Sequence, residues 1–186
     1  GNDMKLRVAG LAPDSAALVD DHMNYSSGMQ AIKLVPASKG NFSYFATSKD
    51  APINKERFTK GYTFETFINI DKDYSDPNYW SAFLSRGGTR NDLPNFNVPG
   101  ADDSDLDEPP MAGAISSLKE IQWAFTDIAP VDMGYSDWSG DVDLGKWYHI
   151  AVVDDPAEGS VVMYVNGVPM LRNQYGTKGQ AHGING

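Results

Sequence analysis

The chain has 186 residues, of which 15 are Lys or Arg and 25 are Asp or Glu, so its formal net charge is −10. This length fits one domain, which can fold without a metal or a disulfide. The negative balance argues against nucleic acid and anionic membranes as partners, because both need clustered cations. The longest apolar stretches are far shorter than the ~20 residues that cross a bilayer. The absence of Cys excludes disulfides, thiolate nucleophiles and zinc–sulfur sites.

Alternation of apolar and polar residues with a period of two dominates the chain and predicts β-strands. Only Asp14–Asp21 is predicted as a short helix. Many short strands with Gly and Pro between them indicate an antiparallel two-sheet β-sandwich or jelly roll. In chain order, the predicted strands are Met4–Ala9, Met29–Val35, Phe42–Thr47, Tyr62–Asp71, Trp80–Ser85, Lys119–Phe125, Lys146–Asp154, Val161–Val165 and Val168–Leu171.

Two turns are predicted to join strands into hairpins in the last third of the chain. Asn166-Gly167 follows an apolar strand, and this dipeptide supplies the two positive φ angles of a type I′ turn. The second hairpin closes through Asp155–Gly159, where Pro and Gly prevent the strand from continuing.

One acidic stretch departs from the strand pattern. Residues 91–118 contain six acidic side chains and four prolines but no Lys or Arg, which predicts a long surface excursion. Alternate Asp residues can place oxygen ligands around calcium. The EF-hand pattern fails because Glu108 stands where Gly is needed, so a solvated acidic loop without an ion is the alternative. The candidate calcium ligands are Asp102, Asp103, Asp105 and Asp107.

Aromatic residues in or beside two predicted loops are the candidate ligand-binding residues. Aromatic faces stack against the apolar faces of sugar rings, and neighbouring polar groups can bind the hydroxyls. The alternative is that the large rings cap the ends of the core. The candidates are Tyr74, Tyr79 and Trp80 in the first region, and Tyr135 and Trp138 in the second.

Catalytic patterns are missing from the sequence. It contains no Gly-x-Ser-x-Gly elbow, no phosphate-binding glycine loop and no helical His-Glu-x-x-His. His149 alternates in phase with Trp147, which predicts a packed strand residue. Glu65 and Glu120 are the plausible sheet glutamates, and each lacks the nearby acidic partner that glycoside hydrolysis needs. No catalytic residue is therefore predicted.

Four segments resemble laminin G-like, or concanavalin A-like, jelly-roll domains. Gly61–Ile68 resembles their F-T-x-E-x-W strand, and Trp80–Gly87 resembles the strand that follows. Asp143–Val153 is similar to the signature l-x-x-G-x-W-x-H-V-A, and Val162–Gly167 is similar to the hairpin l-Y-V-D/N-G.

The resemblance implies a fold of two curved antiparallel sheets and a domain division. Residues 1–28 are expected to form an N-terminal segment with an edge strand, 29–171 the jelly-roll core, and 172–186 a Gly-rich tail. The closing strand of the family has no counterpart in the tail, so Met4–Ala9 is expected to cover the edge in part. Self-association as a weak homodimer is expected from what remains open.

The resemblance also implies a function. Such domains are non-catalytic modules that bind carbohydrate or protein and are appended to secreted bacterial enzymes such as glycosidases, sialidases and phosphoesterases. We therefore expect a secreted or cell-surface glycan-binding module, with calcium as the one cofactor to consider. A docking domain without a ligand of its own, which positions a neighbouring catalytic domain, is the first alternative. A glycanase on the same fold is the second.

Overall fold

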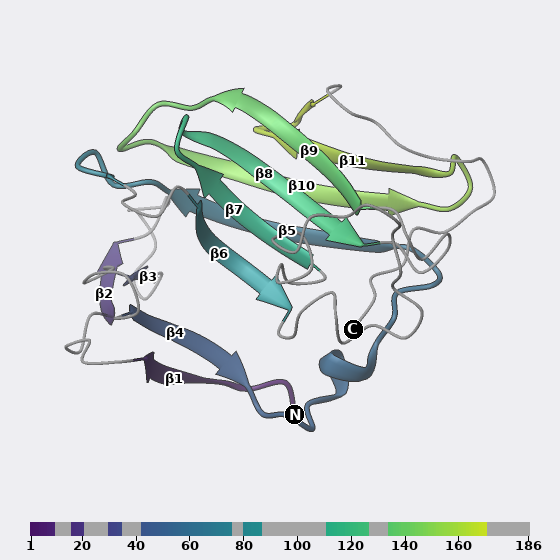
Figure 1. Cartoon of the computed structure of the whole chain (residues 1–186), viewed down its shortest axis with the longest axis horizontal. Coiled ribbons are helices and arrows are strands. Elements are labelled where there is room, and N and C mark those ends of the chain that lie inside the picture. The colour runs from purple at the N-terminus through teal and green to yellow at the C-terminus, as the bar shows by residue number, and fades with distance from the viewer. Residues whose placement is uncertain are drawn as a thin grey trace, which may run out of the picture. The chain divides into compact units, whose positions relative to one another are not determined.

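The structure is a computed structural model that describes residues 1–9, 16–20, 30–34, 42–75, 80–86, 111–126 and 134–170 (Figure 1). The chain divides into two compact units, Gly1–Lys55 and Glu56–Gly186. Each unit is considered by itself below. Within the described residues, no helix has the length and apolar character needed to cross a membrane.

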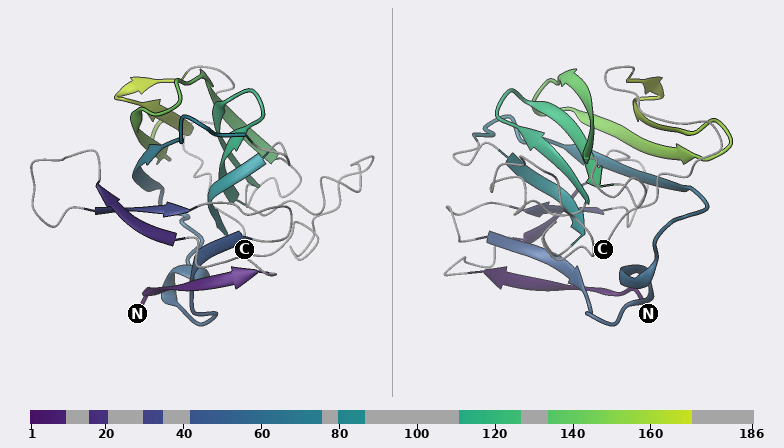
Figure 2. Two further views of the ribbon diagram at one scale, coloured as in Figure 1. Left: turned by 90° about the vertical axis from the view of Figure 1, so that its left-hand side faces the viewer. Right: turned by 45° about the vertical axis from the view of Figure 1, so that its right-hand side comes forward.

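The second unit is a two-layer β-sandwich, which confirms the predicted fold class. Its two antiparallel sheets have the strand orders β12-β11-β10-β5 and β6-β7-β8-β9, and Figure 2 shows them as separate layers. We call the outer face of the β6–β9 sheet the front face, and the outer face of the other sheet the back face. The strands are β5 (Tyr62–Asn69), β6 (Trp80–Arg86), β7 (Met111–Ser116), β8 (Glu120–Thr126), β9 (Gly134–Asp141), β10 (Trp147–Asp155), β11 (Ser160–Val165) and β12 (Val168–Pro169).

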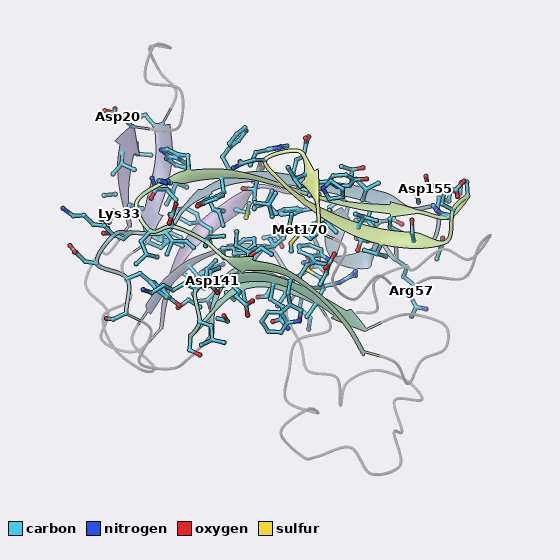
Figure 3. All side chains as sticks on the ribbon, turned by 90° about the horizontal axis from the view of Figure 1, so that it is seen from above. Asp20, Lys33, Arg57, Asp141, Asp155 and Met170 are labelled. Carbon is cyan, nitrogen blue, oxygen red and sulfur yellow. The ribbon has the colours of Figure 1, made fainter. Side chains whose placement is uncertain are left out.

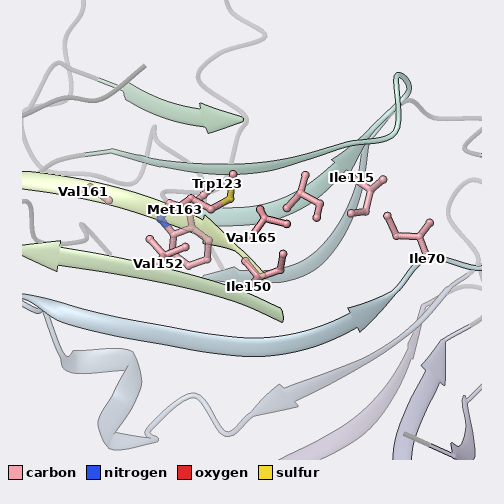
Figure 4. Packing of buried hydrophobic residues seen from close by; sticks show 9 residues of the cluster. Ile70, Ile115, Trp123, Ile150, Val152, Val161, Met163 and Val165 are labelled. Carbon is pink, nitrogen blue, oxygen red and sulfur yellow. The ribbon is translucent and has the colours of Figure 1, made fainter. Parts of the chain in front are cut away.

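The hydrophobic core fills the space between these two sheets, as the side chains in Figure 3 and the close view in Figure 4 show. Both layers contribute, because strand alternation turns one apolar set of each sheet inward. Trp123 of β8 is buried, and its ring stacks on Phe64 of β5 with ring centroids 5.2 Å apart. Val152 of β10 and Met163 of β11 are also fully buried and lie directly opposite each other.

Both predicted hairpins are confirmed. Asn166 and Gly167 have φ angles of 51° and 78°, as a type I′ turn requires. At the other end of β11, the Gly159 amide donates a hydrogen bond to the Asp155 carbonyl (2.8 Å), and Gly159 has a φ of 64°. The Asn166-Gly167 turn joins β11 to β12, and the Asp155–Gly159 turn joins β10 to β11.

The predicted surface excursion is wrong over 111–116, because this segment is the interior strand β7. It pairs with β6 on one side and β8 on the other. A small residue is needed at Gly113, since a Cβ there would lie 2.5 Å from Cζ of Phe83. The small residues of this segment suggest a loop, but at Gly113 the small size is needed for close packing against the Phe83 ring of the neighbouring strand.

The predicted loop around Tyr135 and Trp138 is also wrong, because both belong to β9. Trp138 lies opposite Gln122 of β8, and Tyr135 lies opposite Phe125. Gly, Ser and Asp dominate β9, and these residues are rare in strands. Pairing with β8 outweighs that low propensity.

The described residues of the first unit form two two-stranded ribbons and one turn of 3₁₀ helix. β1 (Met4–Ala9) pairs with β4 (Phe42–Thr47), β2 (Ala16–Asp20) pairs with β3 (Gln30–Leu34), and the 3₁₀ turn spans Pro52–Lys55. The helix predicted at Asp14–Asp21 is therefore wrong, because its Ala-Leu-Val segment pairs with β3. β1 pairs with β4 over its whole length, and cover of a sandwich edge by Met4–Ala9 stays a prediction.

Candidate functional site

Most of the candidate residues lie where their side chains are not described. Tyr79 and the acidic quartet Asp102, Asp103, Asp105 and Asp107 are outside the described residues. The backbone of Trp80 begins β6 opposite Ser116. Calcium binding by the quartet stays a prediction, which melting temperatures in excess calcium and in chelator would test.

Tyr74 lies in the turn after β5, and its ring packs against the hydrophobic core. The Tyr74 amide donates to the Asp71 carbonyl (2.9 Å), and its hydroxyl donates to the Ile115 carbonyl (3.5 Å). These contacts make Tyr74 part of the join between the two sheets. They match the alternative in which a large ring caps the end of the core.

Trp138 lies on the front face beside a polar neighbour. Directly opposite residues on adjacent strands share a face and have Cβ atoms about 5 Å apart, and Gln122 lies opposite Trp138. The row continues across the sheet through Ala114 and Ala82. An indole and an amide therefore adjoin a floor of small side chains.

A second row of the front face has acidic residues at paired positions, next to a register shift between Glu120 and Gln122. Glu120 of β8 lies opposite Asp141 of β9. Glu120 is buried and Asp141 is exposed. The Ser116 hydroxyl oxygen accepts a hydrogen bond from the Glu120 amide (3.2 Å), which holds the tight turn between β7 and β8. Sequence reasoning missed this acidic pair because it forms across strands, through a register that the sequence does not state.

Glu65 and Glu120 do not face each other. The β5 neighbours of Glu65, including Phe64, pack against the core, as do Ile121 and Trp123 beside Glu120. Since side chains alternate along a strand, Glu65 points to the back face and Glu120 to the front face. Glu65 and Glu120 therefore do not form the pair of carboxyl groups on one face that glycoside hydrolysis needs.

Asp137 is a buried carboxylate behind the front face. One oxygen accepts from the Trp138 amide (2.9 Å), and the other accepts from the Met163 amide of β11 (3.1 Å). Burial raises the pKa of Asp137 to about 6, and the two amide hydrogen bonds only partly oppose that rise. This side chain joins β9 of one sheet to β11 of the other.

The back face holds a cluster that sequence reasoning did not single out. The Phe67 ring lies against the His149 ring with centroids 4.8 Å apart, and His149 Nε2 is 3.1 Å from Glu65 Oε1. His149 thus follows the predicted strand phase but points away from the core. One sequence signal was available: Phe67 is an aromatic residue in the polar phase of β5.

The described residues contain no group of three or more His, Asp or Glu side chains that could hold a metal ion. Their chemistry on both outer faces is that of rings, amides and carboxylates. Such groups bind ligands that combine apolar surfaces with hydroxyls.

Comparison with protein families gives a match. The family model of the concanavalin A-like lectin/glucanases superfamily matches residues 39–184, which is most of the chain. This match confirms the resemblance inferred from the strand motifs. No curated protein matches the chain.

Proposed function

Because the chain belongs to the concanavalin A-like lectin/glucanases superfamily, we propose that it is a non-catalytic glycan-binding module of a secreted bacterial enzyme. The observation that carries the proposal is the pair formed by Trp138 and Gln122 on the front face. Lectins and glucanases, after which the superfamily is named, both engage sugars. A docking domain without a ligand would not need this combination of groups.

The physical basis is the amphipathic character of a sugar ring. The Trp138 indole offers a face for the C–H side of the ring, and the Gln122 amide both donates to and accepts from hydroxyls. Asp141, exposed in the next row, adds a carboxylate acceptor. Small side chains at Ala82 and Ala124 let a chain of sugar rings approach the strands closely.

The non-catalytic part of the proposal rests on the separation of the two sheet glutamates. Glycoside hydrolysis needs two carboxyl groups about 5–9 Å apart on one cleft. Glu65 and Glu120 point to opposite faces, so this pair cannot flank one glycosidic bond.

The test is a glycan array followed by titration calorimetry, with and without calcium. We expect at least one glycan to bind, and Trp138→Ala to weaken it by at least about tenfold, as loss of a central aromatic contact does. Leu118→Ala is the matched control, because this residue is 69% exposed in the turn between β7 and β8. Absence of binding to every glycan, or equal affinity of Trp138→Ala and the wild type, would overturn the proposal.

A second candidate function, glycoside hydrolysis, is favoured by the Glu120–Asp141 pair on the front face. Two carboxyl groups on adjacent strands can be close enough for a retaining mechanism. Release of reducing ends from a bound glucan by the wild type, and its loss in Glu120→Gln, would support hydrolysis. Binding without release by both proteins would support the non-catalytic module.

A further inference from the structure

We infer that the back face carries a second, independent binding site for a neutral sugar ring, centred on His149 and Phe67. The inference rests on the proposed function only for the class of ligand. The site, which we call the imidazole patch, consists of Glu65, Phe67, Asn69, Trp147, His149 and Tyr164 around Ala151.

Two side chains contact the imidazole at the centre of the patch, and a turn holds the His149 backbone. Phe67 lies against one side of the ring, and the Glu65 carboxylate holds Nε2. The His149 backbone is clamped by the type I′ turn, because its amide donates to Asn166 Oδ1 (2.9 Å) and its carbonyl accepts from the Asn166 amide (2.8 Å). A group held in this way loses little freedom when a ligand binds, which favours affinity.

The patch is accessible where a ligand would need it. Phe67 is 44% exposed, and the side chains of His149 and Glu65 are 29% and 64% exposed. The Phe67 ring packs against the His149 ring and still leaves apolar surface exposed on the back face, where a ligand can contact it.

Around His149, aromatic rings and polar side chains surround the small side chain of Ala151. Ala151 lies between Glu65 on β5 and Tyr164 on β11, and Trp147 lies opposite Asn69 one row beyond His149. Alternate residues of a strand are about 6.7 Å apart, so Trp147, His149 and Ala151 mark a line of successive positions along β10. Rings and hydrogen-bonding groups therefore occur together at the scale of a small saccharide.

The chemistry of the patch favours a neutral ligand over a cation. A carboxylate can only accept, so the contact with Glu65 makes His149 Nε2 the donor. Glu65 Oε1 is thereby engaged, and a positive ligand at that oxygen would have to compete with the imidazole for it. In the neutral imidazole the other ring nitrogen is an acceptor, which suits a hydroxyl. Sugar hydroxyls and C–H faces match this set.

Two faces that bind the same class of ligand would change how the module works. Binding at one face places the second near other parts of the same polymer, so the apparent affinity for a polysaccharide exceeds that of either face alone. For a single short oligosaccharide this gain is absent.

The test is an NMR titration of the whole chain, with laminarihexaose, cellohexaose and chitohexaose as probes and the ring and amide signals of both faces followed separately. We expect Phe67, His149 and Trp147 signals to shift in the wild type with at least one probe, with at least about tenfold weaker binding in Phe67→Ala. Val168→Ala is the control, because Val168 is 58% exposed on β12 and lies opposite the core-facing Val165, so its side chain is on the other face from the patch. Trp138→Ala is expected to leave the back-face shifts unchanged.

The outcomes separate the two proposals. Shifts confined to Trp138 and Gln122 would overturn the second site and leave the proposed function standing. Shifts confined to the imidazole patch would move the binding function to the back face. No shift with any of the three oligosaccharides would overturn the second site. Tetramethylammonium chloride serves as a cationic probe, and shifts at the patch with this salt but with no oligosaccharide would also overturn the second site.

Discussion

The two units of this chain use the same element, the antiparallel strand pair, with opposite results. In the second unit each sheet covers the apolar face of the other, and the described hydrophobic core lies entirely there. In the first unit the ribbons have two strands each, and such ribbons cannot bury a face by themselves. Most of the exposed large hydrophobic residues belong to this unit, namely Met4, Leu6, Leu18, Ile32, Leu34, Tyr44 and Ile53.

Two cross-strand pairs show the difference directly. Val152 and Met163 lie opposite each other in β10 and β11, and both are 0% exposed. Leu18 and Ile32 lie opposite each other in β2 and β3, and they are 66% and 50% exposed. Pairing alone therefore does not bury an apolar side chain, and a second layer is what provides the stabilisation.

The largest expected effect comes from removing the central ring of the buried layer. Trp123→Ala should lower the free energy of unfolding of the second unit by about 3–5 kcal/mol, because a large cavity opens between the sheets. Urea unfolding followed by near-UV circular dichroism measures the change. A loss below about 1 kcal/mol would show that the core does not depend on this ring.

A smaller effect should appear as a pH dependence of the stability of the second unit. The folded state holds a proton on Asp137 up to a pKa of about 6, whereas an unfolded Asp releases it near 3.9. The stabilisation from this proton is present below about pH 4 and is lost as the pH rises through 6. At 1.36 kcal/mol per pKa unit, the loss is about 3 kcal/mol.

Asp137→Asn isolates this contribution, since its side chain does not titrate. We expect the free energy of unfolding of Asp137→Asn, minus that of the wild type, to rise between pH 4 and pH 7. Chemical unfolding of both proteins at several pH values measures it. A constant difference across that range would contradict the raised pKa.

Close packing between β6 and β7 gives the next effect. Gly113→Ala places a Cβ 2.5 Å from Phe83, and overpacking of this kind costs about 1–3 kcal/mol. Phe83→Leu removes the far end of the ring and should restore part of that stability in the double variant. The non-additivity in a double-mutant cycle is the measurement, and additive losses would show that the two residues do not clash.

The smallest effect is expected in the first unit. Leu18→Ser should change the free energy of unfolding by no more than about 0.5 kcal/mol, as is usual for exposed positions. The measurement is the same urea titration, with Met163→Ser as the buried counterpart. A loss comparable to that of Met163→Ser would show that Leu18 is covered in solution.

The regular part of the fold could be predicted because apolar and polar residues alternate clearly along its strands. The strands around Phe64, Val152 and Met163 follow a clear apolar pattern, and the Asn166-Gly167 dipeptide fixes its turn. β7 and β9 could not be found in this way. Their Gly, Ala, Ser and Asp residues suit strands only because Phe83 and β8 lie beside them, and propensity does not register such neighbours.

The site residues divide along the same line. Trp138 could be proposed from its residue type alone, although its strand was missed. The contacts of His149 with Glu65 and Phe67 join residues more than eighty positions apart. They depend on the register between β5 and β10, which an alternating pattern restricts but does not fix. Residue types therefore suggest the chemistry, and register decides which groups meet.

The hydrogen bond from the Met163 amide to Asp137 also bears on solubility. Among the described strands, β12 is only two residues long, so within the described residues most of β11 lies at a sheet edge, where unpaired backbone groups can recruit a strand from another molecule. At Met163 the amide is taken by Asp137, and the carbonyl accepts from the Met170 amide (2.7 Å). A foreign strand would find neither group available there. Asp137 and Met170 thus occupy both backbone groups of Met163, which makes strand addition at this residue unfavourable.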